Sequence, residues 1–230
     1  MFVDLILKNA TVLSVDENDT ILYDSSVVIK DNYIYDILSD AEAVKKYESI
    51  NIVDIKKNIL MPGLINAHTH LPMSFMKGIA DDLPLEDWLQ RHIWPVEAKF
   101  INEEFIYESS LFGAGEAIKN GVTMCNDMYF LEEQVAEACK KIGLRVCVGE
   151  GILDFPSAVF TDLEKRFTYL RSLSEKYQKD RFVDVAIAPH SIYTCCNDTL
   201  KRCVEFSKDY NLPVHIHLSE TKKEVEDCQK

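Results

Sequence analysis

The 230-residue sequence lacks several features that would assign it to a common class of protein. Basic residues are outnumbered, with 25 lysines and arginines against 38 acidic residues and a formal net charge of −13. Nucleic acids and anionic membrane surfaces are bound through basic patches, so neither is an expected partner. No apolar run approaches the length of a membrane span, and the N-terminus lacks the features of a secretion signal. We therefore expect a cytoplasmic protein.

Paired cysteine motifs are also missing. The seven cysteines are an odd number, no Cys-x-x-Cys occurs, and Cys195 and Cys196 are adjacent, which does not suit a disulfide between them. We expect mostly reduced thiols in a reducing compartment. The His-Glu-x-x-His signature of zinc proteases and the Pro-Cys-x-x-Cys signature of cysteine-ligated nucleobase deaminases are absent as well.

The pattern of apolar residues divides the chain into two parts. Residues 1–58 contain short alternating segments separated by turns, and they predict a small antiparallel β-module with one short helix near residues 41–47. Residues 59–230 alternate strands with helices, which predicts right-handed βαβ units and a parallel sheet. The expected strands of this second part begin near residue 60 and continue at 122–128, 144–151, 182–190 and 212–220.

Two of the expected helices in the second part carry local signals. One follows the Pro84 turn over residues 85–92. The other begins after Asn102, an N-cap residue, and ends at Asn120-Gly121. In the second of these helices we expect the apolar side chains to form the buried face, namely Phe105, Leu111, Phe112, Ala114 and Ile118.

Polar residues gather where the expected parallel strands end. Ligands of such sheets bind beyond the carboxyl ends of the strands, so these residues form a candidate site. They are His68 and His70 after the first strand, Asn126 and Asp127 after the second, Glu150 after the third, His190 after the fourth, and His217 and Glu220 after the fifth.

The His68-Thr69-His70 segment indicates a metal site. Residues i and i+2 of a strand point to the same side, so both imidazoles project together, and zinc binds histidine nitrogen well. An isolated His-x-His also occurs by chance among surface histidines. The fifth strand ends in a second pair, His215 and His217. We choose His217 as the third ligand because it lies nearest the strand end, and we expect His215 in a supporting or core position.

Three imidazole ligands leave a coordination position open for water, as catalytic zinc requires. Zinc lowers the pKa of bound water to near neutral, which supplies a nucleophile without a strong base. Glu220 lies three residues after His217 and is placed to accept the proton of that water and pass it to the substrate. The alternative for Glu220 is a solvated carboxylate that caps the following helix.

Four segments together resemble the amidohydrolase superfamily, and within it the 5-methylthioadenosine/S-adenosylhomocysteine deaminases. They are Pro62-Gly63-Leu64-Ile65-Asn66-Ala67-His68-Thr69-His70, Gly78-Ile79-Ala80-Asp81-Asp82-Leu83-Pro84-Leu85-Glu86-Asp87-Trp88-Leu89, Ala188-Pro189-His190-Ser191-Ile192-Tyr193-Thr194 and His215-Ile216-His217-Leu218-Ser219-Glu220-Thr221. The resemblance runs in order along essentially the whole chain.

The resemblance implies an α/β fold, a (β/α)8 TIM-type barrel with a small β-sandwich built from both chain termini. Residues 1–58 would be the N-terminal part of the sandwich and residues 59–230 a truncated barrel. Only about five strands are present, and the resemblance places a strand-six histidine and a strand-eight metal-binding aspartate in the missing part. We therefore expect a fragment of a longer enzyme that is inactive alone.

The resemblance also implies hydrolytic deamination of the adenine amino group of 5-methylthioadenosine or S-adenosylhomocysteine. His68, His70 and His217 would hold one divalent metal ion, usually zinc, and Glu220 would be the proton shuttle. Glu97 matches the carboxylate that binds ribose hydroxyls, and His190 matches a histidine that contacts the nucleoside. Trp88 is a candidate wall of the substrate pocket, although an aromatic residue of an amphipathic helix also fits a core position.

One position departs from the family pattern. Glu150 stands where the family commonly has a substrate-binding arginine, and an acid there would repel a carboxylate-bearing substrate unless its side chain points away. Alternatives of the same scaffold are aminodeoxyfutalosine, guanine and cytosine deaminases and chlorohydrolases, and a non-catalytic relic is a further possibility. The expected binding partner is a small nucleoside substrate, and a homo-oligomer is an open alternative to a monomer. Iron or manganese could replace zinc in a site built of histidine and carboxylate ligands.

Overall fold

The computed structural model describes residues 1–229 and divides into two compact units, Met1–Gly63 and Leu64–Lys230. The boundary falls later than the sequence indicated, because residues 59 and 60 hydrogen-bond to the first strand of the first unit. Residues 59–63 therefore belong to the first unit.

The first unit is a single five-stranded sheet. Its strands are β1 (Leu5–Leu13), β2 (Ile21–Lys30), β3 (Tyr33–Ser39), β4 (Ile52–Asp54) and β5 (Ile59–Leu60), in the order β3-β2-β1-β4 with β5 also beside β1. Helix α1 (Asp40–Lys46) begins with a capping box between Ser39 and Glu42. A small buried cluster under the sheet contains Val3, Ile6, Val28 and Tyr47.

Two expectations for the first unit were wrong. The sheet is mixed, because α1 returns the chain so that β4 and β5 run parallel to β1. The expected short segments separated by turns are also replaced at one place by a longer strand, β1. Asn9 forms a bulge inside this strand, since it adopts a left-handed backbone conformation with φ 57° and the register shifts between Leu7 and Ala10.

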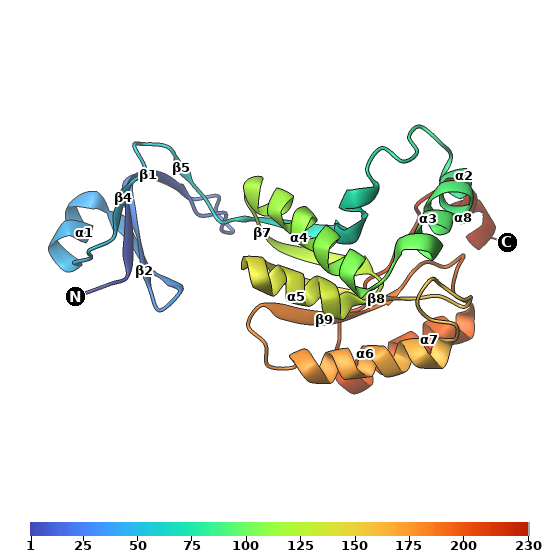
Figure 1. Ribbon diagram of the computed structural model, residues 1–230. Coiled ribbons are helices and arrows are strands. Elements are labelled where there is room, and N and C mark those ends of the chain that lie inside the picture. Colours follow the sequence, from blue (N-terminus) through green and yellow to red (C-terminus); the bar gives the residue numbers. More distant parts are fainter. Residues whose placement is uncertain (230) are drawn as a thin grey trace. The chain divides into compact units, whose positions relative to one another are not determined.

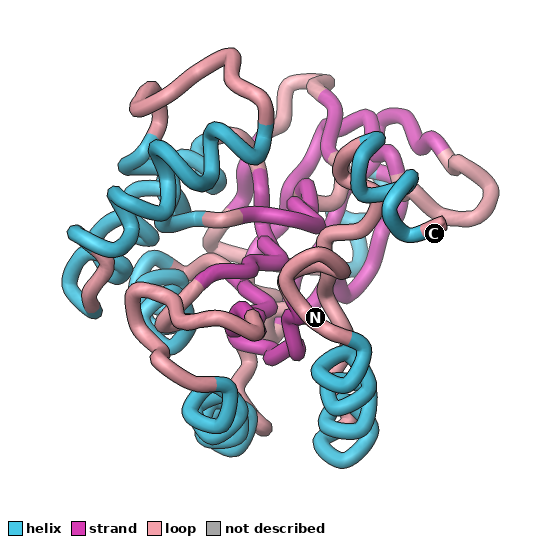
Figure 2. The backbone as a smooth tube through the Cα atoms, turned by 90° about the vertical axis from the view of Figure 1, so that its right-hand side faces the viewer, coloured by secondary structure: helices cyan, strands magenta, loops and turns pink. Residues whose placement is uncertain are grey.

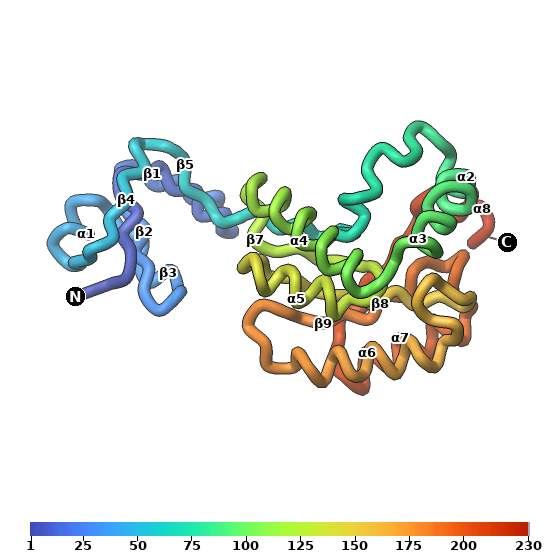
Figure 3. Tube along the Cα trace, in the orientation of Figure 1, coloured from blue at the N-terminus to red at the C-terminus, as the bar shows by residue number. Residues whose placement is uncertain are grey.

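The second unit is built on four parallel strands. They are β6 (Leu64–Thr69), β7 (Val122–Tyr129), β8 (Arg145–Ile152) and β9 (Val183–Pro189), and they lie side by side in chain order. The colours of Figure 3 follow this order, with the chain passing from green β7 to orange β9 across the sheet. The predicted strands at 122–128, 144–151 and 182–190 are confirmed within one residue at each end.

The predicted fifth strand is only partly formed. Residues 212–220 make isolated parallel bridges to the β9 side, between Ile187 and Val214 and between Ser191 and His217. Four residues separate the bridges on one side (187 to 191) and three on the other (214 to 217). This bulge interrupts the ladder, so the segment lies beside β9 without forming a regular strand.

Helices connect the strands and cover the sheet from outside (Figures 1 and 2). After β6 come the 3-10 turn η1 (Leu71–Met76), α2 (Leu85–Trp88), the π-helical turn η2 (Leu89–Ile93), α3 (Trp94–Phe100) and α4 (Glu103–Lys119). The later helices are α5 (Glu132–Ile142), α6 (Leu163–Tyr177), α7 (Asn197–Tyr210) and α8 (Lys222–Cys228).

The helix expected over residues 85–92 is longer and changes its winding. It continues through η2 into α3 and ends at Phe100. Pro95 has no amide hydrogen to donate to the carbonyl of Arg91, and the amide of Trp94 donates to the carbonyl of Leu89, five residues earlier. This turn brings Glu97 toward the end of the sheet where the strands finish.

The buried face of α4 differs from the expected one. Asn102 caps the helix as predicted, since its side chain accepts a hydrogen bond of 2.9 Å from the amide of Phe105. Phe112, however, is 50% exposed, and apart from fully buried Ile106 the buried face consists of small residues. These are Ser109, Ser110, Gly113 and Ala114. Close approach of η1 leaves no room for large side chains there.

One apolar cluster fills the second unit between its sheet and helices. Val146, Val148, Leu170 and Ile187 are among its fully buried members. All seven cysteines are free thiols, as predicted. Within residues 1–229 no helix combines the length and apolar character needed to cross a membrane.

The packing of α4 on η1 predicts opposite effects for two glycines of one helix. A Cβ at Gly113 would lie 2.8 Å from the backbone oxygen of Leu71, whereas one at Gly115 would make an ordinary contact of 3.7 Å with Ile142. Gly113→Ala should lower the free energy of unfolding by about 1–3 kcal/mol through overpacking. Gly115→Ala is the matched control and should raise it by up to about 1 kcal/mol. Equal effects in chemical denaturation would contradict this account of the α4 face.

Candidate metal centre and substrate cavity

A cavity of about 570 Å³ opens at the carboxyl ends of the parallel strands. Every residue that the sequence singled out as a ligand, substrate contact or proton shuttle lines it. These residues are His68, His70, Glu97, His190, His217 and Glu220. The first two histidines lie at the end of β6, Glu97 lies on α3, His190 follows β9, and His217 and Glu220 lie on the segment beside β9. The fold thus brings together side chains from distant parts of the sequence.

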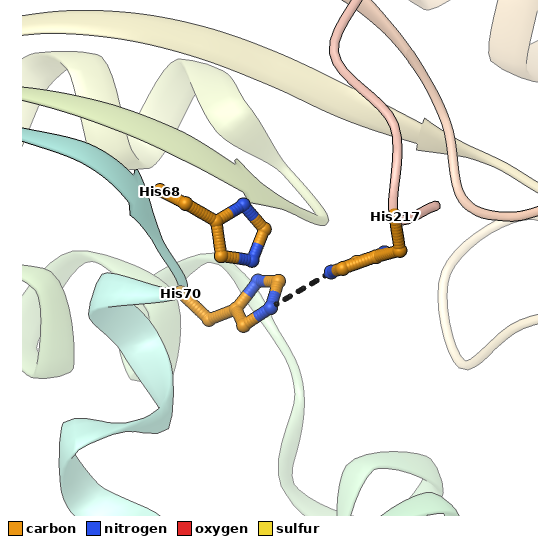
Figure 4. A group of neighbouring side chains, drawn as sticks. All are labelled: His68, His70 and His217. Atoms are coloured by element: carbon orange, nitrogen blue, oxygen red, sulfur yellow. Dashed lines mark hydrogen bonds between the residues drawn. The ribbon is translucent and has the colours of Figure 1, made fainter. Parts of the chain in front are cut away.

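Three imidazoles converge in this cavity (Figure 4). One nitrogen from each of His68, His70 and His217 lies within 4.8 Å of the others. Nε2 of His70 and Nε2 of His217 are 3.3 Å apart. The structure thus brings together the three histidines expected to act as ligands, although they are separated by up to 149 residues in the chain (68 to 217).

The outer nitrogen of each ring is occupied by a second group. Nδ1 of His70 contacts the carbonyl oxygen of Met128, and Nδ1 of His217 lies 2.8 Å from the carbonyl oxygen of His190. Carbonyl oxygens only accept, so both Nδ1 atoms carry the proton and both Nε2 atoms carry a lone pair in the neutral rings.

This arrangement fits a cation. Two lone pairs that face each other at 3.3 Å repel unless a proton or a metal ion lies near them. Burial and the neighbouring imidazoles lower the pKa of His70 to about 4, so an additional proton is unfavourable at neutral pH. A divalent ion that binds Nε2 removes the repulsion and keeps the outer hydrogen bonds, as in metal sites supported by carbonyl groups.

His68 has a supporting histidine. Nε2 of His215 lies 2.8 Å from Nδ1 of His68. When Nδ1 of His68 is the donor in this contact, Nε2 of His68 carries the lone pair for a ligand. Burial, together with the charges of His68 and His217, lowers the pKa of His215 to about 4. His215 therefore occupies the supporting position that the sequence suggested, in contact with a candidate ligand.

Asp127 fixes the segment that carries the first two histidines. Its Oδ1 accepts hydrogen bonds from the hydroxyl of Thr69 and, at 2.7 Å, from the amide of Leu71. Asp127 is fully buried and does not line the cavity. Its role is to hold the backbone on both sides of His70 against β7.

The two cavity carboxylates are each held by a tyrosine. The hydroxyl of Tyr129 donates to Oε1 of Glu97 at 2.6 Å, and the hydroxyl of Tyr193 donates to Oε2 of Glu220 at 2.9 Å. Glu97 is only 7% exposed, and its burial raises its pKa, an effect that the Tyr129 hydrogen bond partly offsets. Both carboxylates present polar oxygens to a cavity with mainly apolar walls.

His190 lies in the cavity wall beside His217, with their ring centroids 4.8 Å apart. Its Nδ1 is 3.0 Å from the hydroxyl of Thr194 and 3.2 Å from that of Ser191. Burial and the nearby imidazoles of His217 and His70 lower its pKa to about 3, so the ring is neutral at physiological pH. A neutral ring with one nitrogen occupied can exchange one hydrogen bond with a ligand through the other.

Apolar side chains form the wall away from the histidines. Trp88 is among them, and its indole donates to the carbonyl of Ala80 at 3.1 Å. The loop after β8 contributes Leu153 and Phe155, and buried Arg166 anchors this loop by donating to the carbonyl of Phe155 at 3.1 Å. The expectation that Trp88 lies in the pocket wall is therefore confirmed.

Glu150 points away from the cavity. It is fully buried, does not line the cavity, and accepts a hydrogen bond of 3.1 Å from the amide of Glu132. Because its side chain does not face the cavity, Glu150 would not repel the carboxylate of S-adenosylhomocysteine. The argument against this substrate therefore no longer holds. Glu132 is equally buried beside it, and the two acids belong to the packing between β8 and α5.

Sequence reasoning missed the two tyrosines. Tyr193 stands within one of the quoted family segments, and Tyr129 is the last residue of β7, one position beyond the expected end of that strand. Aromatic residues at strand ends commonly belong to the core, so residue type alone did not mark them. Extending the search for strand-end residues by one position would have included Tyr129.

The fold and the site together define a class of protein: an α/β protein with a candidate histidine metal site at the ends of parallel strands. The sequence profile of the Amidohydrolase family matches residues 59–230, and the chain belongs to this family. The TIM-barrel-like α/β fold of the second unit follows from this membership and from the solved structures that the chain resembles.

Two curated relatives carry the same name, 5-methylthioadenosine/S-adenosylhomocysteine deaminase. The protein of Thermodesulfovibrio yellowstonii is 42% identical over 227 residues, 98% of this chain and 52% of the relative. That of Aquifex aeolicus is 38% identical over 223 residues, 97% of this chain and 50% of the relative. The chain spans about half the length of the curated relatives it matches.

A solved structure of a deaminase also superposes on this chain. The crystal structure of an adenosine deaminase from Xanthomonas campestris with bound zinc superposes with a TM-score of 0.95 at 35% identity, over 98% of this chain and 52% of the other. The match covers both the sheet and the segments that carry the three converging histidines, since almost the whole chain is included.

Glu150 provides a prediction for the pH dependence of stability. Burial raises its pKa from 4.5 to about 8, so the folded protein holds a proton that the unfolded chain has lost between these values. The free energy of unfolding should therefore fall as the pH rises from about 4.5 to about 8. Glu150→Gln keeps the acceptor for the amide of Glu132 and should make this fall smaller, whereas exposed Glu175→Gln should not.

Denaturant unfolding at several pH values measures this difference. An unchanged pH dependence in Glu150→Gln would show that Glu150 is ionised in the folded protein. Buried Asp127 and Glu132 have raised pKa values as well, so part of the fall should remain in the variant.

Proposed function

We propose that the whole protein is a metal-dependent hydrolytic deaminase of adenosine-type nucleosides. It would convert 5-methylthioadenosine or S-adenosylhomocysteine and water into the corresponding inosine analogue and ammonia. The observation that carries this proposal is the set of three imidazole nitrogens in one cavity with two carboxylates. The names of the relatives and of the zinc-bound adenosine deaminase support the reaction and the substrate class.

His68, His70 and His217 are the proposed ligands of one divalent ion, and zinc is favoured because it suits imidazole nitrogen and needs no redox chemistry. The bound ion would supply positive charge that makes water acidic enough to react near neutral pH. His215 and the carbonyls of Met128 and His190 keep the three rings oriented for this ion.

Glu220 is the proposed catalytic acid and base. Its carboxylate accepts a proton from the attacking water while the water oxygen bonds to carbon 6 of the purine. The protonated Glu220 then gives this proton to nitrogen 1 of the purine. The proton of the new hydroxyl passes to the amino nitrogen, the bond from carbon 6 to that nitrogen breaks, and the carbonyl product and ammonia are formed. Tyr193 holds one carboxylate oxygen of Glu220 at 2.9 Å and leaves the other for this transfer.

Glu97 and His190 are the proposed substrate-binding residues, together with Glu220. The Glu97 carboxylate is placed to accept hydrogen bonds from ribose hydroxyls, and neutral His190 exchanges one hydrogen bond with the nucleoside. The wall of Trp88, Leu153 and Phe155 offers apolar contact to the base or to a thioether substituent. These contacts favour a nucleoside over the free bases and triazines of the alternative deaminases and chlorohydrolases.

Two further features of the fold are proposed on the same basis. The first unit is the N-terminal part of a β-sandwich, supported by its five-stranded sheet with a buried cluster on it. The second unit is part of a (β/α)8 barrel. Cytoplasmic localisation and a possible homo-oligomer remain predictions from the sequence.

Turnover of the full-length gene product tests the reaction. We expect ammonia release from 5-methylthioadenosine and a fall in kcat of about 10²- to 10⁴-fold in Glu220→Gln, which removes a general acid and base. Glu226→Gln in α8, whose partner is exposed Lys222, is the matched control and should retain activity. Turnover of guanine or cytosine alone would contradict the nucleoside assignment, and no turnover of any substrate by metal-loaded protein would favour the non-catalytic relic.

Metal content after dialysis tests the ligand set independently of turnover. The protein should retain about one ion per chain, and His68→Ala, His70→Ala or His217→Ala should each lose it, since each removes one of three protein nitrogens. His92→Ala removes a histidine that does not line the cavity and should retain the ion. Full metal content in all three ligand variants would refute the proposed centre.

A further inference from the structure

Glu97 is a buried acid with a single hydrogen-bond partner among residues 1–229. That partner is the hydroxyl of Tyr129, at 2.6 Å from Oε1, and no lysine, arginine or histidine of the described chain forms an ion pair with Glu97. A carboxylate in this position is poorly solvated by the protein. Its second oxygen is left for whatever occupies the cavity.

Tyr129 can act only as a donor to this acid. The side chain is 6% exposed, and both burial and the charge of Glu97 raise the pKa of its phenol, which keeps the proton on the oxygen. The ring is fixed independently of this hydrogen bond, with its centroid 5.1 Å from that of Phe130 and 6.3 Å from that of His70. The hydroxyl is therefore presented at a defined point of the cavity wall.

The end of β7 contacts both the histidine cluster and Glu97. The carbonyl of Met128 contacts Nδ1 of His70, and the hydroxyl of the next residue, Tyr129, holds Glu97. Glu97 itself lies on α3, not on a strand of the sheet, and α3 follows directly after the π-helical turn η2. Without the Tyr129 hydrogen bond, no polar contact of the described chain would fix the Glu97 carboxylate relative to the metal histidines.

We infer that Tyr129 is a positioning residue that makes the enzyme selective for a ribose with free 2′ and 3′ hydroxyls, by holding the Glu97 carboxylate at a fixed distance from the reacting end of the cavity. This inference rests on the proposed function. A vicinal diol offers two donors, and the Glu97 carboxylate has acceptor positions left after Tyr129 occupies one. A substrate without the diol makes no hydrogen bond to Glu97 and leaves the second carboxylate oxygen of this buried acid without a partner.

The test compares two substrates in one variant of the full-length, metal-loaded protein. Tyr129→Phe keeps the ring contacts and removes the hydroxyl. For 5-methylthioadenosine we expect kcat/KM to fall about tenfold to a hundredfold, mainly through KM, since a hydrogen bond to a charged group is lost. For the 2′,3′-dideoxy analogue of the same nucleoside we expect less than about a threefold change. Tyr107→Phe, which also loses only a hydroxyl and lies outside the cavity, should change neither value.

A double-mutant cycle separates positioning from a general structural role. Glu97→Gln should itself reduce the preference for the diol, and adding Tyr129→Phe to it should have little further effect, because the two residues act through one contact. Additive losses, or equal losses on the two substrates in Tyr129→Phe, would overturn the inference. Absence of deamination by the wild-type protein would instead contradict the proposed function, so the two failures are distinguishable. Turnover of the dideoxy analogue by each variant reports an intact fold and metal centre.

Discussion

The hydrogen bonds on the outer nitrogens of three histidines are the constraint on which the site depends. His70 and His217 each direct Nδ1 at a backbone carbonyl, and His68 directs Nδ1 at His215. The two carbonyl contacts fix the tautomers of His70 and His217, and one nitrogen from each of the three rings lies around one point. The protein thus maintains a set of unprotonated donors at close range, which is unfavourable without a cation and favourable with one.

Buried contacts elsewhere in the second unit support this arrangement of the histidines. Buried Asp127 holds the backbone around His70, and small residues of α4 allow η1 to lie close against the helix. Asp127, Glu132 and Glu150 bury three acids beside the sheet with raised pKa values, an arrangement that lowers stability as the pH rises. One of these acids, Asp127, also holds the segment on both sides of the candidate ligand His70.

Much of the site was predictable because its signals are local. Alternation along a strand placed His68 and His70 on one side, and strand-end position identified His217. Strand-end position also placed His190 in the candidate site, and the resemblance added its contact with the nucleoside. Glu97 was identified only by resemblance, since a lone acid on a helix carries no local signal. Features set by tertiary contacts were missed: the small buried face of α4 depends on η1, and the bulge near His217 depends on β9. Tyr129 and Tyr193 were missed because strand-end aromatics resemble core residues.

The central claim is that a single cation binds between these three Nε2 atoms. Anomalous diffraction from crystals of the zinc-loaded protein tests it most directly. The account predicts one anomalous peak at roughly 2.0–2.1 Å from Nε2 of His68, His70 and His217, with their Nδ1 contacts retained. A peak bound through Nδ1 or through cysteine sulfur, or no peak in this cavity, would contradict it.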